Sequence, residues 1–292
     1  MSEFEVINDV RAELGEGPAW DDRKNVLYYV DILGHAIYEY DPASGKTSEY
    51  SQESYVGAVV PTQSGRLAVA GYQNLYTFDP AANAVEPLAT PPVQDSDLRF
   101  NDGKCDPAGR FWAGTISLSG RKGAASLYRL DTDGSLHTML TDVSISNGLG
   151  WSPDGKTMYY IDTPTHTVVA FDYDMETGRI SNQRVVIEVP ESEGGPDGMT
   201  VDEDGMLWIA HWGGSQVACW DPNTGRKRAS IALPAPHTTS CVFGGPDRNE
   251  LYVTSARTGL SDEQLKQNPL SGAVFKIQMQ TRGAATYRYR DE

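Results

Sequence analysis

One short unit recurs along the chain, and its spacing constrains the fold more than any other feature. In the best copy, residues 146–156, a polar residue and a glycine open a short apolar run that Pro153-Asp154-Gly155 closes, and an apolar strand follows. The marker glycines are Gly17, Gly57, Gly103, Gly148 and Gly198, at steps of 40, 46, 45 and 50 residues, and a further 43 residues lead to a weaker copy at Cys241. A period of this length, with several short strands in each unit, is typical of β-propeller blades. The sequence therefore predicts an all-β, six-bladed propeller of four-stranded antiparallel blades, with residues 1–292 forming one domain.

The first unit shows where the strands of a blade are expected. Apolar or β-branched runs predict strands at 18–20, 26–31, 36–40 and 47–51, in order from the innermost to the outermost. Residues 4–10 predict one more strand, which we expect to pair into the last blade and close the ring. Helical periodicity is confined to residues 261–268.

Charge and cysteine content narrow the class of partner. The net charge of −16 disfavours nucleic acid and anionic membranes, which need clustered Lys and Arg, and favours an acidic, solvated surface. Three cysteines without a Cys-x-x-Cys pair are expected to be buried thiols, which fits a reducing compartment. The acidic start of the chain has no apolar signal core, and we expect a cytoplasmic protein that is a monomer or a weak homodimer.

Equivalent residues of the six units are expected to line one end of a central channel. The residue before each marker position is, in chain order, Glu16, Val56, Asp102, Asn147, Asp197 and Ser240. Crowded carboxylates repel one another unless a proton or a cation intervenes, and an Asp/Glu/Asn set without Cys or His suits a hard divalent ion. The alternative is that Asp-Gly and Asn-Gly only form the turn that enters each strand, which explains Asp102 and Asn147 but explains Glu16 poorly.

Further polar groups are expected around this channel mouth. Arg99 and Asn101 precede the third ring residue and suit a polyhydroxylated or carboxylated ligand, although Arg99 alone could equally pair with Asp95 or Asp97. His211 and Trp212 end a strand of the fifth unit. The loop 117–124, which contains Ser119, is either a flexible lid or an ordinary surface loop.

Several segments together resemble a known propeller family. Residues 14–18, 99–104, 146–149 and 196–199 resemble, in order and spacing, the signature segments of the senescence marker protein (regucalcin), gluconolactonase and luciferin-regenerating enzyme family. The resemblance extends to 243–247 and 254–257 and is greatest to bacterial sugar lactonases.

The resemblance implies one divalent ion held by Glu16, Asn147 and Asp197, with Arg99 and Asn101 contacting substrate. It implies hydrolysis of a sugar aldonolactone, of the gluconolactone or xylonolactone type, to the aldonic acid. Asp197 would act as general base, and Asp102, Ser119, His211 and Trp212 would support the ion or line the pocket. In regucalcin-like members, a carboxylate that follows a strand of the third blade also contacts the sugar. At the corresponding place this chain has Ser117-Leu118-Ser119, without an acidic residue, so its preference among sugar hydroxyl groups is left open. The native ion stays open among Ca, Zn, Mn, Mg and Fe(II).

Three other functions compete with the lactonase interpretation. The same ligands would serve a calcium-binding regulatory propeller without catalysis. An aryl-ester or organophosphate hydrolase would use a similar fold, although the polar ring disfavours apolar esters. An interaction scaffold has no use for carboxylates inside its channel. Neither a Gly-x-Ser-x-Gly elbow nor a phosphate-binding glycine loop occurs in the sequence.

Overall fold

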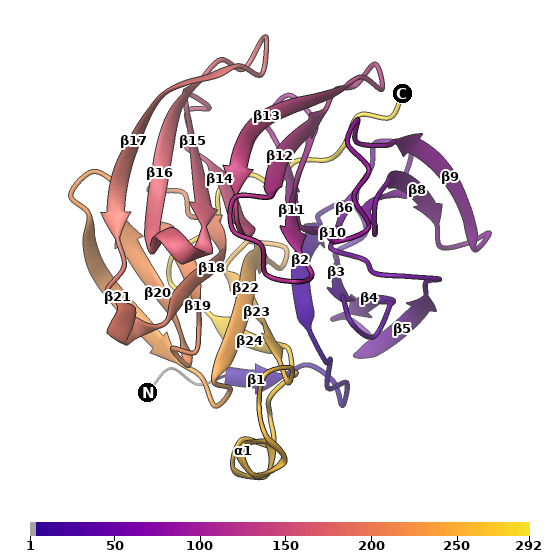
Figure 1. The fold of residues 1–292 in the computed structure, drawn as a ribbon. Coiled ribbons are helices and arrows are strands. Elements are labelled where there is room, and N and C mark those ends of the chain that lie inside the picture. Colours follow the sequence, from indigo (N-terminus) through magenta and orange to yellow (C-terminus); the bar gives the residue numbers. More distant parts are fainter. Residues whose placement is uncertain (1–3) are drawn as a thin grey trace.

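The computed structural model describes residues 4–292, and nearly all of their regular structure is β-strand (Figure 1). The described chain has one α-helix, α1 (Asp262–Gln267), and two single-turn 3-10 helices, η1 (Thr163–Thr165) and η2 (Glu191–Glu193). Helix α1 begins at Ser261, whose side chain accepts a hydrogen bond from the Gln264 backbone in a capping box. The predicted helical segment at 261–268 is thereby confirmed.

Four sheets each contain four antiparallel strands in chain order. The first is β2 (Gly15–Asp21), β3 (Val26–Asp31), β4 (Ala36–Asp41) and β5 (Lys46–Ser51). The second is β6 (Ala58–Pro61), β7 (Leu67–Ala70), β8 (Leu75–Asp79) and β9 (Ala84–Ala89). The third is β10 (Leu98–Cys105), β11 (Phe111–Ser117), β12 (Ala125–Leu130) and β13 (Leu136–Val143). The fourth is β14 (Ser146–Trp151), β15 (Thr157–Asp162), β16 (Thr167–Tyr173) and β17 (Ile180–Glu188).

The remaining strands form one sheet of eight. Its first half is β18 (Gly195–Val201), β19 (Leu207–Trp212), β20 (Gln216–Asp221) and β21 (Arg226–Ala232). Its second half is β22 (His237–Gly244), β23 (Glu250–Ala256), β24 (Phe275–Gln278) and β1 (Phe4–Val6). The halves meet through the single residue pair Trp212–His237. The prediction of an all-β, propeller-like fold with four-stranded antiparallel blades is confirmed, while the described residues form five hydrogen-bonded sheets rather than six separate ones.

The N-terminal strand lies where the sequence predicts it. β1 pairs antiparallel with β24, from Phe4 opposite Ile277 to Val6 opposite Phe275, and the Phe4 ring meets the Phe275 ring edge-on. The first and last parts of the chain therefore share one sheet, which leaves β24 without a free edge on that side.

The first strands of the repeats surround a common axis. β2, β6, β10, β14, β18 and β22 contact one another in this circular order, and β22 returns to β2. The marker glycines permit this close approach: a Cβ on Gly148 would lie 2.7 Å from the Asp197 carbonyl oxygen, and one on Gly198 would lie 2.8 Å from Ser240 Cα. The repeat thus keeps glycine where the neighbouring inner strand leaves no room for a side chain.

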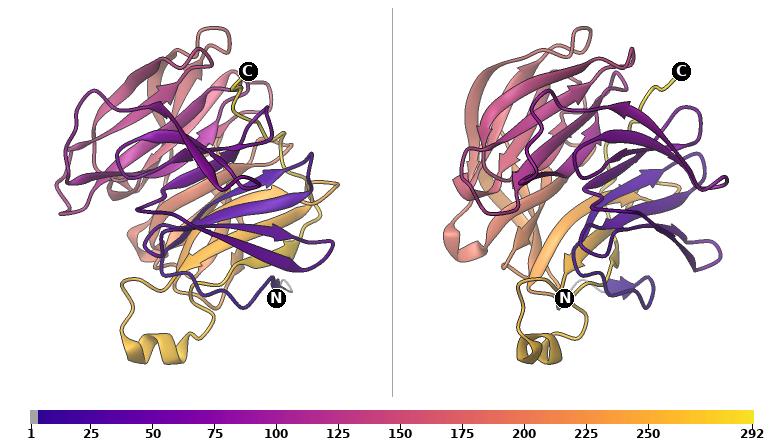
Figure 2. Two further views of the ribbon diagram at one scale, coloured as in Figure 1. Left: turned by 90° about the vertical axis from the view of Figure 1, so that its right-hand side faces the viewer. Right: turned by 45° about the vertical axis from the view of Figure 1, so that its right-hand side comes forward.

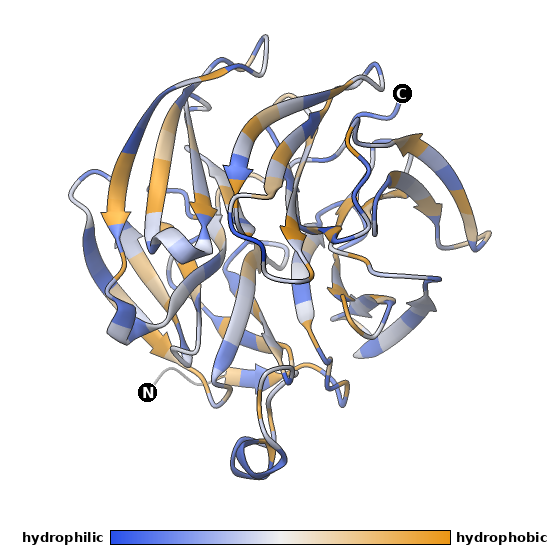
Figure 3. Ribbon diagram, in the orientation of Figure 1, coloured by the Kyte–Doolittle hydropathy of each residue, from blue (hydrophilic) through white to orange (hydrophobic). Residues whose placement is uncertain are grey.

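Burial falls from the axis outward. Every residue of β14 is buried, whereas β21 is exposed at all positions except Ile231. The other outermost strands, β5, β9, β13 and β17, are likewise mostly exposed or half-buried, while α1, which projects from the body of the molecule, is largely polar (Figures 2 and 3). No helix within residues 4–292 has the length and apolar character needed to span a membrane.

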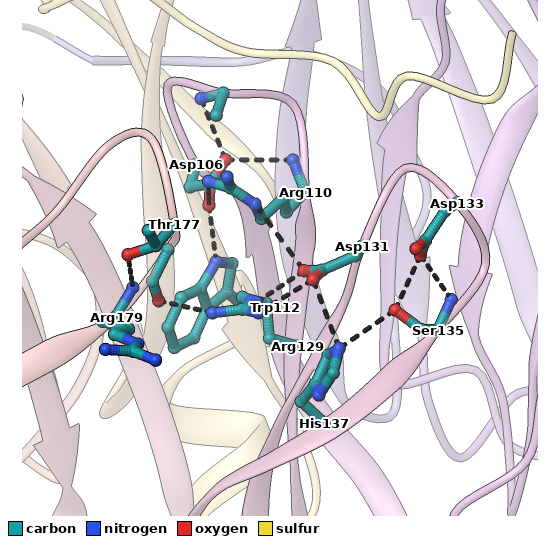
Figure 4. A network of polar contacts seen from close by, with 12 residues as sticks. Asp106, Arg110, Trp112, Arg129, Asp131, Asp133, Ser135, His137, Thr177 and Arg179 are labelled. Atoms are coloured by element: carbon teal, nitrogen blue, oxygen red, sulfur yellow. Dashed lines mark hydrogen bonds and ion pairs between the residues drawn. The ribbon is translucent and has the colours of Figure 1, made fainter.

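Buried aspartates fasten the turns after the inner strands. Asp106, which has no exposed surface, accepts hydrogen bonds from the backbone of Ala108 and Arg110 and from Trp112 Nε1, each at 2.9 Å (Figure 4). Tyr173 of the next blade donates to the same carboxylate at 2.7 Å. This network joins the third and fourth blades at the end of the channel remote from the ring residues.

The C-terminal segment closes that remote end. Ala284 N donates to Val201 O of β18 at 2.9 Å, and Tyr289 N donates to Pro61 O of β6 at 3.0 Å. Residues 284–287 line a pocket together with residues of the inner strands, including Trp20, Trp151 and Phe243. Glu16, Asn147 and Asp197 lie in the first halves of their strands, so they belong to the opposite end of the axis.

Candidate active site

Irregular backbone at the ring positions turns polar side chains toward the axis. The pairing register shifts after Glu16, between Phe100 and Gly103, after Asn147 and between Pro196 and Met199. Such bulges add residues to one strand and redirect their side chains, and they are common beside active sites. In the second blade, β6 pairs with β7 without a shift, and its ring residue is the apolar Val56.

Three ring carboxylates are buried close to one another. Glu16, Asp102 and Asp197 are each less than a tenth exposed. Burial, followed by the charge of Asp102, raises the pKa of Glu16, and burial, followed by the charges of Glu16 and Asp102, raises the pKa of Asp197 well above its ordinary value. Burial also raises the pKa of Asp102, against the opposing effect of Lys104. The three side chains therefore share one electrostatic environment, as the sequence predicts.

The carboxylates differ in their hydrogen bonds. Gly103 N donates to Asp102 Oδ1 at 2.7 Å and Gly17 N donates to Glu16 Oε2 at 3.1 Å, so each of these carboxylates accepts from the next residue of its own strand. Asp197 Oδ1 is buried and has no hydrogen-bond partner. A buried carboxylate oxygen without a donor is costly unless another positive group satisfies it.

Amide and guanidinium groups form the wall beside these carboxylates. Arg99 Nη1 donates to Asn101 Oδ1 at 2.8 Å, and Asn101 Nδ2 donates to Asn147 Oδ1 at 3.0 Å. Arg99 is buried, its charge acts on Glu16, and its Nε has no partner. The structure thus joins Arg99, Asn101 and Asn147 in one chain of contacts next to the carboxylates.

The predicted alternative partners of Arg99 bind elsewhere. Arg121 contacts Asp95 at 2.5 Å and Asp97 at 2.8 Å, and Arg99 lies instead against the Tyr55 ring at 6.0 Å. The alternative that Arg99 forms a surface ion pair with Asp95 or Asp97 is therefore wrong, and Arg99 is buried beside the ring residues.

Three of the candidate pocket residues are engaged by other groups of the protein. The ring nitrogens of His211 contact the Glu193 carbonyl at 3.0 Å and Trp220 Nε1 at 3.4 Å, so neither nitrogen is free. Trp212 stacks on His237 at 4.0 Å. Ser119 is exposed and donates to Asp97 Oδ2 at 2.9 Å, which ties the 117–124 loop to the segment before β10.

Two site residues are absent from the sequence-based predictions. Thr163, in η1, accepts a hydrogen bond from Asn147 Nδ2 at 2.8 Å, and Lys104 Nζ donates to the Met199 carbonyl of β18 at 2.5 Å. The available signal for Thr163 was its position: it follows the second strand of its blade, as the segments after Ser117 and His211 do in theirs. Lys104 lies in the repeated segment but carries no spacing signal.

Among residues 4–292 no group of three or more His, Cys, Asp or Glu is arranged to hold a metal ion. The Glu16, Asn147 and Asp197 set contains only two residues of these types, because its third member is an amide. Its donor atoms are all oxygens, and one of them, Asp197 Oδ1, lacks a partner. These residues fit a hard divalent cation by their chemistry.

Comparison with known proteins assigns the chain to a family. Residues 14–257 match the SMP-30/Gluconolactonase/LRE-like region, and the chain belongs to this family. It is 41% identical over 275 residues to a putative sugar lactone lactonase, YvrE, of Bacillus subtilis, with 94% of each chain covered. It is also 41% identical over 281 residues to regucalcin of Gallus gallus, covering 94% of this chain and 93% of that one. The resemblance predicted from the sequence is confirmed.

A solved structure agrees with the fold and the family. The crystal structure of regucalcin from Agrobacterium tumefaciens, described as a calcium-binding protein, superposes with a TM-score of 0.95 at 30% identity, covering 99% of this chain and 98% of that chain. At the level of the family, these relatives bear out the expectation of a hydrolase that acts on lactones.

Proposed function

We propose that this protein hydrolyses a sugar aldonolactone, of the gluconolactone or xylonolactone type, to the aldonic acid in a reaction that depends on one divalent metal ion. The observation that carries the proposal is the buried set of Glu16, Asn147 and Asp197, in which Asp197 Oδ1 has no partner within the protein. Family membership and the sugar lactonase relative support the substrate class.

Glu16, Asn147 and Asp197 would hold the ion through oxygen atoms. Ca, Mg, Mn, Zn and Fe(II) all accept such donors, and availability decides between them. When bound, the ion polarises a carbonyl oxygen and makes a nearby water more acidic.

The side chains around the proposed ion have different roles in the proposed reaction. Asp197 takes the proton of the attacking water as general base while it remains a ligand of the ion, because a carboxylate has acceptor positions on two oxygens and the protein leaves Oδ1 without a partner. Arg99 and Asn101 orient the hydroxyl and carbonyl oxygens of the lactone with forked and mixed hydrogen-bonding groups. The carboxylate of Asp102 adds negative charge beside the three proposed ligands, and the positive charge of Lys104 partly offsets it.

We also propose that residues 1–292 form a single six-bladed propeller. The eight-stranded sheet divides naturally into two blades, because only the pair Trp212–His237 joins its halves and because each half contributes one inner strand, β18 or β22, to the circle of contacts. The three free, buried cysteines fit a cytoplasmic location. For the oligomeric state, we propose a monomer or a weak homodimer.

The decisive experiment is a pH-stat assay on chelator-treated protein. Gluconolactone and xylonolactone are each tested with Ca, Mg, Mn, Zn and Fe(II) added singly. We expect acid release that one or more ions restore and that Asp197→Ala abolishes, whereas Arg99→Ala mainly raises KM.

Two outcomes would contradict the proposal. Near-normal turnover by Asp197→Ala would refute the assigned general base. Tight metal binding without acid release from either lactone would favour the alternative, a calcium-binding regulatory propeller without catalysis.

A further inference from the structure

The Thr163 hydroxyl lies between two ring positions of neighbouring blades. It accepts a hydrogen bond from Asn147 Nδ2 at 2.8 Å and contacts the Pro196 carbonyl oxygen, also at 2.8 Å. Asn147 belongs to the fourth blade, and Pro196 immediately precedes Asp197 in the fifth. One side chain thus contacts both a proposed metal ligand and the backbone that carries another.

The direction of these hydrogen bonds follows from chemistry alone. A carbonyl oxygen can only accept, so the single hydroxyl proton of Thr163 must point to Pro196. The hydroxyl oxygen is then an acceptor toward Asn147, and the atom facing it must be the amide nitrogen. The side-chain oxygen of Asn147 is thereby turned away from Thr163, toward Asn101.

A second contact supports the same orientation. Asn101 Nδ2 donates to Asn147 Oδ1 at 3.0 Å and to the Ser146 carbonyl at 2.9 Å, while its own oxygen accepts from Arg99. An amide oxygen has two acceptor positions, so Asn147 Oδ1 keeps one for a further positive group. An inverted Asn147 amide would place nitrogen against nitrogen at Asn101 and would lose that acceptor.

Packing holds Thr163 in this position. The residue starts η1 directly after β15, and η1 contacts β18. The Thr163 methyl group lies close to Gly195, where an added Cβ would come within 3.1 Å of Thr163 Cγ2. Both halves of the side chain, the hydroxyl and the methyl, therefore face the fifth blade.

We propose that Thr163 is a positioning residue for the metal site: it fixes the Asn147 amide with its oxygen toward the ion and couples the fourth blade to the strand that carries Asp197. This inference rests on the proposed metal site of the lactonase. Partners that orient a metal ligand through its second polar atom commonly change metal affinity by about 10- to 100-fold when removed.

The test compares metal binding by Thr163→Val and Thr163→Ser. Valine keeps the shape and removes the hydroxyl, whereas serine keeps the hydroxyl. Chelator-stripped proteins are titrated calorimetrically with CaCl₂ and with MnCl₂. We expect about 10- to 100-fold weaker binding for Thr163→Val and binding within roughly threefold of wild type for Thr163→Ser, a difference that hydroxyl-dependent positioning requires.

Thr165→Val is a matched control in the same turn. Thr165 Oγ1 donates to the Asp162 carbonyl at 2.8 Å and contacts Thr167 on the exposed side, away from Asn147. The control should bind both ions as wild type does. If Thr163→Val fails to fold, Thr163→Ala replaces it, with the same expectation.

The outcomes separate this inference from the proposed function. Wild-type affinity in a folded Thr163→Val or Thr163→Ala protein would overturn the positioning role even if lactone turnover is found. Weakened metal binding together with absent lactone turnover in wild type would support the positioning role and overturn the lactonase. Absence of ion binding by wild type would overturn both. At saturating metal, we expect KM for the lactone to change much less than metal affinity.

Discussion

Two buried aspartates should respond in opposite directions when each is changed to asparagine. Asp197 is buried with an unpartnered oxygen beside Glu16 and Asp102. An asparagine amide is still polar but carries no charge, so the substitution relieves the repulsion among Asp197, Glu16 and Asp102 and the cost of burying the charge, at about 1.4 kcal/mol for each pKa unit by which the folded state disfavours ionisation. Without metal, Asp197→Asn should therefore stabilise the fold by about 1–3 kcal/mol, which is roughly 2–10 °C in Tm for a chain of this size.

Asp106 supplies the contrast, because its carboxylate is fully used. Its Oδ2 accepts from Trp112 Nε1 and lies 3.4 Å from Arg110 Nη1 (Figure 4), and it also accepts from the Tyr173 hydroxyl. An amide nitrogen there would face donors only. Two unsatisfied donors at about 1–3 kcal/mol each, with the charge of Arg110 left uncompensated, give an expected loss of about 3–5 kcal/mol.

Thermal unfolding in chelator, followed by circular dichroism, measures both effects, and a second scan includes the activating ion. A ligand at 100 times its Kd stabilises the folded state by about 2.7 kcal/mol. Wild type and Asp106→Asn should show this gain, while Asp197→Asn should lose most of it. The reasoning would be refuted if metal-free Asp197→Asn melted below wild type, or if Asp106→Asn melted with wild type.

Two further predictions concern the ends of the channel. Tyr289 is buried in the C-terminal segment, and its hydroxyl donates to the Asp131 carbonyl at 3.1 Å. In urea unfolding, Tyr289→Ala should lower the free energy of unfolding by about 3–5 kcal/mol and Tyr289→Phe by about 1 kcal/mol. Equal losses in the two variants would contradict this ranking. Hydrogen bonds from Ser117, Arg121 and Ser119 hold the pKa of Asp97 well below its ordinary value, so its contribution is present above the unfolded pKa of about 4 and is lost only in stronger acid. The stability difference between wild type and Asp97→Asn should accordingly persist from pH 7 to pH 5 and shrink below about pH 4; a difference that vanished by pH 5 would show that another group controls it.

The repeat predicted most of the fold because its physical causes are local. At Gly148 and Gly198 the neighbouring inner strand leaves no room for a side chain. The Asp-Pro sequences that begin at Asp41, Asp79 and Asp221 each form a turn in which the carboxylate accepts a hydrogen bond from the backbone two residues further on. The predicted strands at 26–31 and 47–51 differ from β3 and β5 by no more than one residue. The innermost strand is longer than predicted, because the bulge after Glu16 interrupts the alternation that marks a strand.

The site was less predictable, because its side chains come together through contacts between blades. Equivalent positions in the repeat predicted Glu16, Asp102, Asn147 and Asp197 around one axis, and the family resemblance then selected Glu16, Asn147 and Asp197 as the proposed ligands. No period could indicate that Thr163 reaches Asn147, or that Lys104 spans from β10 to β18. For His211, the position in the sequence was misleading. It lies at a strand end, which suggested that it lines the pocket, but its side chain stacks on Trp220 of the same blade.

Buried aspartates that follow similar sequence patterns differ in the number of hydrogen-bond donors that the protein provides to them. Asp106 and Asp202 each lie six residues before a tryptophan whose indole donates to them at 2.9 Å, and each receives two backbone N–H groups from its turn. Donors within the protein satisfy both oxygens of these carboxylates, so the two aspartates stabilise their blades. Asp197 is equally buried, yet one of its oxygens receives nothing from the described chain. A carboxylate that folding leaves unsatisfied is available to a cation or a proton. This difference in hydrogen bonding, more than residue type or position in the repeat, distinguishes the proposed active end of the channel from the end that the C-terminal segment closes.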